Sequence, residues 1–338
     1  MGLARTRLPN RELVDEYIDA VYTWVDGRDP EFQEQLGRYR TRTSRKSHGH
    51  GAARFHDNDE LRFSLRSLEL FAPWIRTVHI VTNGQVPSWI DRSHPRLSLT
   101  RHEDLFPDRH LLPVFNSWAI EWQLFRIPGL SRRFLYLNDD FFLGRPVAPS
   151  DFMAPGGGCR ILVENFDMLS RAAARHDTDR ALAFTEDMLN TRFGFRSPRK
   201  KIAHAPRLLD REILEDLHRL WPKEIQRTTA QRFRDPESVS LETLYAYYLL
   251  ECTERQGHHL QTVATGTPEC YTFVMLGSPL WRAWKRLLGI VCRRPKFFCL
   301  NDDTHNASRA VRALIRMGAR AALKALYRRP SSFEAKRT

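Results

Sequence analysis

The clearest hydrophobic pattern in the chain lies between residues 61 and 72, where apolar residues recur at intervals of four, three and four. They are Leu61, Leu65, Leu68 and Ala72. This spacing predicts a helix with one buried face, which Asp57 or Asn58 caps and which Pro73 ends. The apolar run at 77–82 predicts a buried strand that stops at an Asn-Gly turn. A helix and a strand are therefore expected in close succession.

Three further runs, rich in β-branched and aromatic residues, predict strands at 18–25, 96–100 and 133–137. The periodicity of 115–127 predicts a helix. Its aromatic residues on one side are Trp118, Trp122 and Phe125. We interpret this stripe as core packing, because a platform for stacked bases is the rarer use of such residues. The alternation of strands and helices predicts an α/β fold with a mostly parallel sheet flanked by helices.

The character of the chain changes after residue 153, at a Pro-Gly-Gly-Gly break. Beyond it the pattern is more helical, with helices expected at 210–220 and 239–250. We therefore expect three portions. They are an α/β core at 1–153, a more helical portion that completes the site at 154–305, and a basic amphipathic helix within 306–338.

The terminal helix is expected at 307–329 and has apolar residues along one side, with arginines around them. The apolar positions are Val311, Leu314, Ile315 and Leu326. Such a helix can lie on an anionic membrane surface or dock on the body of the protein, and the pattern leaves both open. Residues 1–16 are typical of a polar arm or short helix, and 37–53 predict a mobile basic loop.

The net positive charge of the chain limits the classes of partner that it is expected to bind. Its 338 residues carry a net charge of +13, mostly from arginine, which favours nucleotides, sugar phosphates, acidic polymers, anionic lipids or nucleic acid. The five cysteines show no metal-binding spacing, so we expect reduced thiols. We see no signal peptide and no apolar run near the ~18 residues that a membrane span needs. The expected location is the cytoplasm.

Acidic residues follow the predicted strands. Asp26 follows the first strand, Asp139 and Asp140 follow the strand that ends at residue 137, and another group occupies 57–60. Ligands of such sheets bind beyond the carboxyl ends of the strands, so these acids are expected to share one crevice. Carboxylates suit Mg²⁺ or Mn²⁺, which can bridge a diphosphate. The alternative is that Asp-Asp is an ordinary turn and that the other acids stabilise a helix end.

Basic residues provide a second set of candidates. His204 lies in a proline-flanked basic loop and could hold a phosphate or transfer a proton. Arginine and lysine at 199–201 and Arg234 could clamp a diphosphate, or could form an ordinary solvated face. A second Asn-Asp-Asp at 301–303 could bind metal or cap the terminal helix. The chain has none of the motifs of Walker-type kinases, Rossmann dehydrogenases, serine hydrolases or zinc proteases.

Five blocks, taken together, resemble the Stealth family. This family includes bacterial capsular-polysaccharide phosphotransferases and the catalytic subunit of the lysosomal-enzyme N-acetylglucosamine-1-phosphotransferase. The blocks are IDAVYTWVDGRDP at 18–30, RFHDNDELRFSLRSLELFAPWIRTVHIVTNGQVPSW at 54–89, FLYLNDDFFLG at 134–144, FGFRSPRKKIAHAPRLLDREI at 193–213 and PKFFCLNDD at 295–303.

The resemblance implies a glycosyltransferase-A-like nucleotide-binding core. It also implies transfer of a hexose 1-phosphate, such as N-acetylglucosamine 1-phosphate, from a UDP-sugar to a hydroxyl of a glycan or lipid-linked glycan, with release of UMP. The setting would be synthesis of capsule or another cell-surface polysaccharide, with peripheral contact to an anionic membrane surface. One alternative is an ordinary metal-dependent glycosyltransferase that releases UDP. Another is a non-catalytic polyanion-binding protein, although nucleic acid is not expected because no RNA-binding aromatic signature is present.

The resemblance also suggests roles for individual residues. The catalytic candidates are Asp57, Asp59, His204 and Arg234, one aspartate being the base for the acceptor hydroxyl. The substrate-binding candidates are Asp26, Asn58, Arg62, Asn83, Asn138, Lys200 and Asn301. The candidate ligands of Mg²⁺ or Mn²⁺ are Asp139, Asp140 and Asp302. Spacing alone leaves open which carboxylate is the base and which binds the metal.

Overall fold

The computed structural model describes most of the chain. The described ranges are 17–40, 55–154, 158–195, 198–256, 261–264, 267, 269–304 and 307–336. The arm expected at 1–16, the loop expected at 37–53 from residue 41 onward, and most of the glycine-rich break lie outside the described residues.

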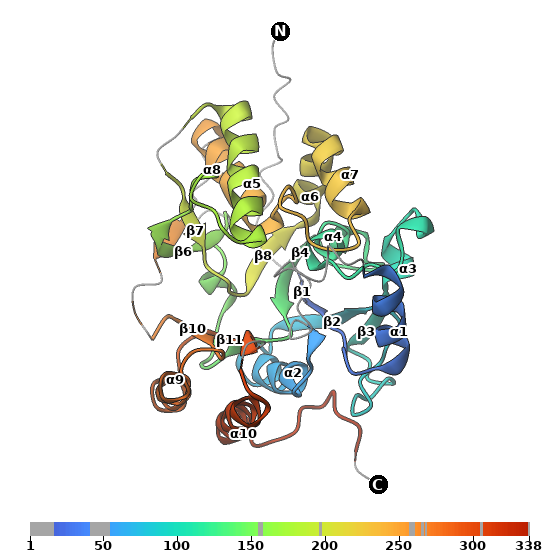
Figure 1. The fold of residues 1–338 in the computed structure, drawn as a ribbon, viewed down its shortest axis with the longest axis vertical. Helices are drawn as coiled ribbons and strands as arrows, with labels where there is room; N and C mark the ends of the chain where they lie inside the picture. Colours follow the sequence, from blue (N-terminus) through green and yellow to red (C-terminus); the bar gives the residue numbers. More distant parts are fainter. Residues whose placement is uncertain are drawn as a thin grey trace.

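A five-stranded sheet forms the centre of the molecule (Figure 1). Its strands, in spatial order, are β3 (Leu97–Arg101), β2 (Ile75–Thr82), β1 (Ile18–Thr23), β4 (Arg133–Asn138) and β8 (Arg207–Asp210). The first four are parallel, and β8 pairs antiparallel with β4. The prediction of an α/β fold with a mostly parallel sheet is confirmed. The carboxyl ends of β1, β2 and β4 lie at one edge, since Thr23 pairs with both Val81 and Asn138.

Two smaller sheets adjoin the central one. The first contains β10 (Tyr271–Met275), β11 (Phe297–Asn301) and β5 (Phe141–Leu143). The second contains β7 (Lys200–Ile202), β6 (Arg160–Asp167) and β9 (Gln261–Ala264). The chain passes from β4 in the central sheet to β5 in the first small sheet through only two residues, Asp139 and Asp140. The two acids therefore lie where the sheets meet.

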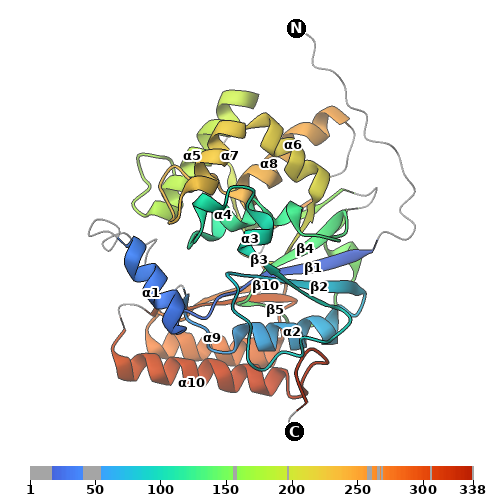
Figure 2. The same ribbon diagram turned by 90° about the vertical axis from the view of Figure 1, so that its right-hand side faces the viewer.

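Helices cover the sheets from two sides, as Figures 1 and 2 show. The helices α5 to α8 gather on one side, and α2, α9 and α10 lie on the other. The α-helices are α1 (Pro30–Tyr39), α2 (Glu60–Phe71), α3 (His102–Leu105), α4 (Ser117–Glu121), α5 (Asp177–Phe193), α6 (Arg211–Leu220), α7 (Pro222–Ala230), α8 (Leu241–Gln256), α9 (Leu280–Arg293) and α10 (Arg309–Leu326). Short 3₁₀ turns occur at Arg109–Leu111, Leu124–Arg126 and Pro149–Asp151.

The three inner strands, β2, β1 and β4, are largely buried on both faces, and their successive side chains point to opposite sides of the sheet. Val21 and Phe134 enter the core beneath α5 to α8, whereas Ala20, Tyr22 and Leu135 enter the core beneath α2. This two-sided burial explains why the strands appear in the sequence as nearly continuous apolar runs.

The structure of α2 confirms its predicted face and corrects its predicted cap. The four apolar positions given above are all buried, and the helix ends before Pro73. The N-cap is Asp59, which has a left-handed backbone (φ 69°) and makes no capping hydrogen bond with its side chain. The capping prediction for Asp57 and Asn58 is wrong because both side chains bond within the loop instead: Asp57 accepts from the backbone of Asp59, and Asn58 donates to Glu60.

The predicted helix at 115–127 is shorter than expected. The chain forms α4 and then a 3₁₀ turn, and Trp122 at the break is held in place because its indole nitrogen donates to the carbonyl of Val239 (3.0 Å). Trp118, Trp122 and Phe125 are all buried, so the interpretation of the aromatic stripe as core packing is confirmed.

The C-terminal helix docks on the body of the protein, which was one of the two alternatives. The helix α10 packs on α9 and buries Ile315 and Leu323. Of the apolar positions expected along one side of this helix, Leu314 is exposed and does not pack on the protein. All five cysteines are free. Among the described residues, no helix combines the length and the apolar character needed to cross a membrane.

Candidate active site

The end of β1 is fixed to the end of β2 by a glutamine. The side-chain amide of Gln85 accepts from the backbone nitrogen of Asp26 (2.8 Å) and donates to its backbone oxygen (3.1 Å). Asn83, at the end of β2, supports this turn by accepting from the backbone nitrogen of Gln85 (3.4 Å). The Asp26 carboxylate, which stays partly exposed, pairs with Arg28 (3.2 Å). The loop after β1 therefore presents an acid at the carboxyl edge of the sheet.

A close backbone contact brings a second acidic loop to the same place. The nitrogen of Gly27 donates to the carbonyl of Phe55 (2.6 Å), and a Cβ at Gly27 would lie 2.2 Å from that oxygen, so only glycine fits here. The loop continues to Asp57, which is buried. Burial raises the pKa of Asp57 to about 6, and the charges of Asp59 and Asp26 add to the rise against a backbone hydrogen bond.

Glu60 and Asn58 form an internal pair in this loop. The Asn58 amide donates to one carboxylate oxygen of Glu60 (2.8 Å), and the Asn58 backbone donates to the other. Burial raises the pKa of Glu60 to about 7, and the charge of Asp57 adds to the effect while the bonds from Asn58 oppose it. Asn58 therefore holds a buried acid in place.

The β4–β5 turn supplies two more acids, Asp139 and Asp140, both half-buried. Burial raises the pKa of Asp139 well above its usual value, and the charges of Asp140, Glu60 and Asp57 raise it further. Burial also raises the pKa of Asp140. These four carboxyl groups, Asp57, Glu60, Asp139 and Asp140, are hereafter called the acidic cluster.

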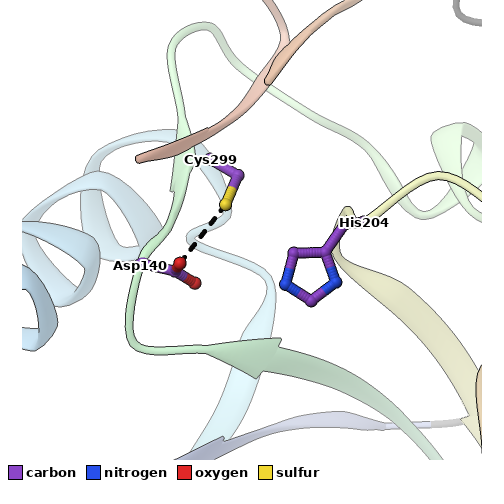
Figure 3. A group of neighbouring side chains, drawn as sticks. All are labelled: Asp140, His204 and Cys299. Carbon is purple, nitrogen blue, oxygen red and sulfur yellow. Dashed lines mark hydrogen bonds between the residues drawn. The ribbon is translucent and has the colours of Figure 1, made fainter. Parts of the chain in front are cut away.

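His204 lies across from Asp140 and Cys299, as Figure 3 shows. One ligand-type atom each of Asp140, His204 and Cys299 lie within 4.8 Å of one another. The thiol of Cys299 donates to Asp140 (3.3 Å), and the amide of Asn138 donates to Nε2 of His204 (3.2 Å). The ring of Phe141 packs edge-on against the imidazole. The histidine is therefore fixed beside the acidic cluster.

Beyond His204 lies a second group of charged residues, Glu121, Arg207, Arg234 and Glu242, hereafter called the arginine cluster. Glu242 pairs with Nη1 of Arg207 (2.6 Å) and lies 3.9 Å from Nδ1 of His204. Burial alone would raise the pKa of Glu242, but the charges of Arg207 and His204 outweigh it and lower that pKa. Glu242 is therefore a permanent anion that orients Arg207 and lies beside His204.

The other half of the arginine cluster is held by α4. The Arg234 guanidinium lies 4.4 Å from the ring centroid of Trp118 and donates to the hydroxyl of Ser117 (2.6 Å). Glu121 is buried at the end of α4, and burial raises its pKa to about 7, with Arg207 and Arg234 opposing the rise. These contacts tie Arg234 to the group around His204.

Several predicted site residues have partners elsewhere. Arg62 pairs with Glu334 near the C-terminus (2.5 Å), and Lys200 pairs with Asp167 in the second small sheet (2.8 Å). Asn301 ends β11, and its backbone oxygen accepts from Leu276 (3.0 Å). These contacts hold the fold together and do not bring Arg62 or Lys200 to the acidic cluster.

Asp59 and Asp302 both face α10. Asp59 pairs with Arg320 (2.7 Å), and Asp302 lies 3.5 Å from Arg316 and 3.6 Å from His56. Burial alone would raise the pKa of Asp302, but hydrogen bonds from His56 and Thr304 lower it. The structure thus groups Asp139 and Asp140 with Asp57 and Glu60, and it gives Asp302 cationic neighbours of its own.

The acidic cluster fits a hard divalent cation. Oδ1 of Asp140 is buried without a hydrogen-bond partner. The raised pKa values of Asp139 and Asp140 mean that negative charge at these carboxyl groups is unfavourable as long as no cation balances it. Oxygen ligands of this kind suit Mg²⁺ or Mn²⁺. The set of Asp140, His204 and Cys299 is less suited to these ions, because a thiol and an imidazole are softer ligands, and burial raises the pKa of Cys299.

Sequence reasoning missed three charged members of the site, Glu121, Arg207 and Glu242. The two glutamates had a weak signal: Glu121 is a lone acid within Ser-Trp-Ala-Ile-Glu-Trp, and Glu242 is a lone acid within Ser-Leu-Glu-Thr-Leu. A single charge in an otherwise apolar segment is seldom buried unless it is paired. Their partners come from distant segments, which the sequence does not connect.

Models of three conserved regions of Stealth proteins match the chain. Conserved region 1 matches residues 16–44, conserved region 2 matches 54–161, and conserved region 3 matches 203–251. The chain belongs to the Stealth family. This confirms the resemblance drawn from the sequence blocks, and the second and third regions contain the acidic cluster and the arginine cluster.

Named Stealth relatives include exopolysaccharide phosphotransferases. SCO6023 of Streptomyces coelicolor is 38% identical over 325 residues, which cover 94% of this chain and 52% of that relative. CpsY of Mycobacterium tuberculosis is 36% identical over 294 residues, which cover 85% of this chain and 52% of CpsY. The chain therefore spans about half the length of these relatives.

Solved structures with a similar arrangement include two glycosyltransferases. The galactosyltransferase LgtC, in complex with donor and acceptor sugar analogues, overlaps with a TM-score of 0.43 at 9% identity, covering 91% of this chain and 95% of LgtC. Mouse xyloside xylosyltransferase 1 overlaps with a TM-score of 0.38 at 13% identity, covering 85% of this chain and 98% of that enzyme.

Proposed function

We propose that this Stealth protein transfers a hexose 1-phosphate from a UDP-sugar to a hydroxyl of a glycan acceptor, in the synthesis of an exopolysaccharide such as a capsule. The acceptor is a glycan or its lipid-linked precursor, and the reaction takes place in the cytoplasm. One observation carries the proposal: the acidic cluster, with two buried and two half-buried carboxyl groups, lies beside His204 and the arginine cluster. The family and the names of its relatives point in the same direction.

The reaction requires one bond to form and one to break. The acceptor oxygen attacks the phosphorus that carries the hexose, the bond from that phosphorus to the oxygen of UMP breaks, and the acceptor proton passes to a base. We propose Asp57 as this base, because a carboxylate with a pKa of about 6 is both charged and basic near neutral pH. Asp59, the other candidate, is instead paired with Arg320. The product is a phosphodiester.

The basic groups of the site would stabilise the transferring phosphate. We propose this role for His204, which lies beside Glu242, for Arg234, which α4 holds, and for Arg207, which the sequence did not single out. Phosphoryl transfer depends mainly on positioning and on neutralising charge, so cations fixed before the substrate binds are effective.

The donor would contact the carboxyl edge of the sheet. We propose that Asp26, Asn58 and Asn138 line the nucleotide-sugar, because all three lie where β1, α2 and β4 meet. Asp139 and Asp140 would hold Mg²⁺ or Mn²⁺, which when bound neutralises charge on the diphosphate.

Product analysis tests the proposal. The protein is incubated with Mg²⁺, candidate UDP-sugars and short glycans, and nucleotides are separated by chromatography. The expected result is acceptor-dependent UMP that disappears on chelation and in Asp139→Asn, but persists in Asp187→Asn, which removes an exposed carboxylate paired with Arg171. UDP as product would identify an ordinary glycosyltransferase. No nucleotide product with any donor would contradict both reactions.

A further inference from the structure

Large apolar side chains are exposed on α9 and α10. On α9 they are Trp281 (63% exposed), Trp284 (45%) and Leu288 (64%), and on α10 they are Leu314 (41%) and Met317 (58%). Solvent-exposed tryptophan and leucine are costly to leave in water when they gather in one place, so such a group indicates a binding surface.

These five side chains form one surface, hereafter called the tryptophan patch. Residues three and seven apart lie on the same side of a helix, which places Trp281, Trp284 and Leu288 together. The ring of Trp284 crosses to α10 at Gly318, where an added Cβ would lie 3.3 Å from the indole. Gly318 adjoins Met317 and is one turn from Leu314. Figures 1 and 2 show α9 and α10 side by side at the outside of the molecule, away from α5 to α8.

The helices around the tryptophan patch are strongly basic. The helix α9 carries four arginines or lysines, all exposed, and α10 carries five, while neither helix contains an acid. The exposed cations of α9 are Arg282, Lys285, Arg286 and Arg293. No aspartate or glutamate occurs at 270–301 or 304–333 of the sequence. The apolar surface is therefore surrounded by positive charge.

We propose that the tryptophan patch docks on the surface of an anionic membrane, with the indole rings at the level of the headgroups and the cations on the anionic lipids. Tryptophan favours the membrane–water interface, and basic residues around an apolar face strengthen binding to anionic lipid. The inference rests on the proposed function in one respect: a lipid-linked acceptor would explain why the protein works at a membrane surface.

The contact differs in part from the one suggested by the sequence, in which the terminal helix lies on the membrane with its whole apolar stripe. Ile315 of that stripe is buried in the protein core, and only Leu314 belongs to the tryptophan patch. The membrane would instead meet the seam between two helices that are already folded, so binding requires no rearrangement of α10.

Charge complementarity favours a membrane over a second copy of this chain. A symmetric dimer through the tryptophan patch would bring the basic surfaces of α9 and α10 against themselves, and like charges across an interface are unfavourable. An anionic lipid surface satisfies both the apolar and the basic parts of the patch.

Vesicle flotation of the full chain, without donor, acceptor or metal, tests the inference. Vesicles contain phosphatidylcholine alone or with about 30 mol% phosphatidylglycerol. The test variant is Trp281→Ser with Leu288→Gln, and the control is Phe166→Ser with Leu169→Gln, which changes two exposed apolar residues near the far end of β6. We expect binding to the anionic vesicles, weakened about tenfold or more in the test variant and unchanged in the control.

A second variant separates the role of charge from that of apolar contact. Arg282→Gln with Arg286→Gln should weaken binding to anionic vesicles at low salt, without changing the melting temperature. The inference is overturned if the wild-type chain does not float with anionic vesicles, or if the test variant floats as the wild type does. It is also overturned if the chain self-associates through the patch in place of binding vesicles. Because no substrate is present, these results do not depend on whether the transferase reaction is correct.

Discussion

Replacing Asp57 with asparagine is expected to stabilise the protein at neutral pH while removing its activity. Asparagine has the same shape, and its side-chain oxygen can keep the hydrogen bond from the backbone of Asp59 (3.0 Å). What it removes is a negative charge that burial and the charges of Asp59 and Asp26 make unfavourable. The substitution therefore tests two properties of this carboxylate separately, its role in catalysis and its destabilising effect on the folded state.

The magnitude follows from the pKa of Asp57, which rises from 3.8 to about 6 on folding. A shift of about two units at about 1.4 kcal/mol per unit gives up to about 3 kcal/mol. Because the folded pKa is the higher one, the folded state binds the extra proton between these values. Stability of the wild type therefore falls as pH rises from about 4 to about 6, and the full penalty is present above that. For a chain of this length the gain in melting temperature would be about 4 °C.

The assay is thermal unfolding of the metal-free protein between pH 4 and pH 8, with Asp187→Asn as the control for loss of an exposed carboxylate. The difference in melting temperature between Asp57→Asn and wild type should grow from near zero at pH 4 to its full value at neutral pH. A variant that is less stable than wild type at neutral pH, or whose advantage does not change with pH, would refute the reasoning.

Three further substitutions probe the same architecture. Glu242→Gln should lower kcat about a hundredfold and also lower the melting temperature, because Arg207 loses the anion that both orients and neutralises it; unchanged kinetics would argue against this role. Asp19→Asn should lower the free energy of unfolding, measured in urea, by about 3 kcal/mol, since Arg76 then loses the buried carboxylate with which it pairs. This loss should shrink as pH falls below about 4. The folded fraction should keep its activity. Gly27→Ala should reduce kcat about a hundredfold by displacing the acidic loop, whereas Gly37→Ala, which meets no neighbour within 4 Å, should not.

The central sheet could largely be predicted from the sequence because its inner strands, β2, β1 and β4, are buried on both faces and therefore stand out as apolar runs. The limits of 18–25, 77–82, 96–100 and 133–137 each differ from the observed strands by only one to a few residues. The strand β8 was not predicted. It has only four residues and pairs antiparallel at the edge of the sheet, so neither length nor alternation distinguishes it.

Errors in the helices had a common physical cause, which is tertiary contact overriding local pattern. The cap expected from Asp57 is absent because that side chain is used inside the loop, where Gly27 brings the chain close to Phe55. Leu314 fits the apolar period of α10, yet it faces solvent because α9 and the small sheet cover a different arc of the helix. A helical period identifies an apolar face but not what the face packs against.

The candidate site was partly predictable for a related reason. Asp139 and Asp140 follow a strand directly, so the topology of the sheet alone places them at its carboxyl edge. Glu121, Arg207 and Glu242 come from α4, β8 and α8, and their positions depend on how three elements pack.

The acids and the cations of the site are held in place in different ways. The acids that would meet the diphosphate come from short loops at strand ends, which hold carboxylates together despite their repulsion. Of the cations that would meet the transferring phosphate, Arg207 is instead held by the half-buried anion Glu242, whose lowered pKa keeps it charged, and Arg234 is held by Trp118 and Ser117. Before substrate binds, Glu242 therefore already balances part of the positive charge of the arginine cluster, whereas the acidic cluster carries an excess of negative charge. Binding of a cation together with an anionic diphosphate would therefore relieve the acidic cluster without disturbing Arg207, which makes metal and donor binding mutually favourable.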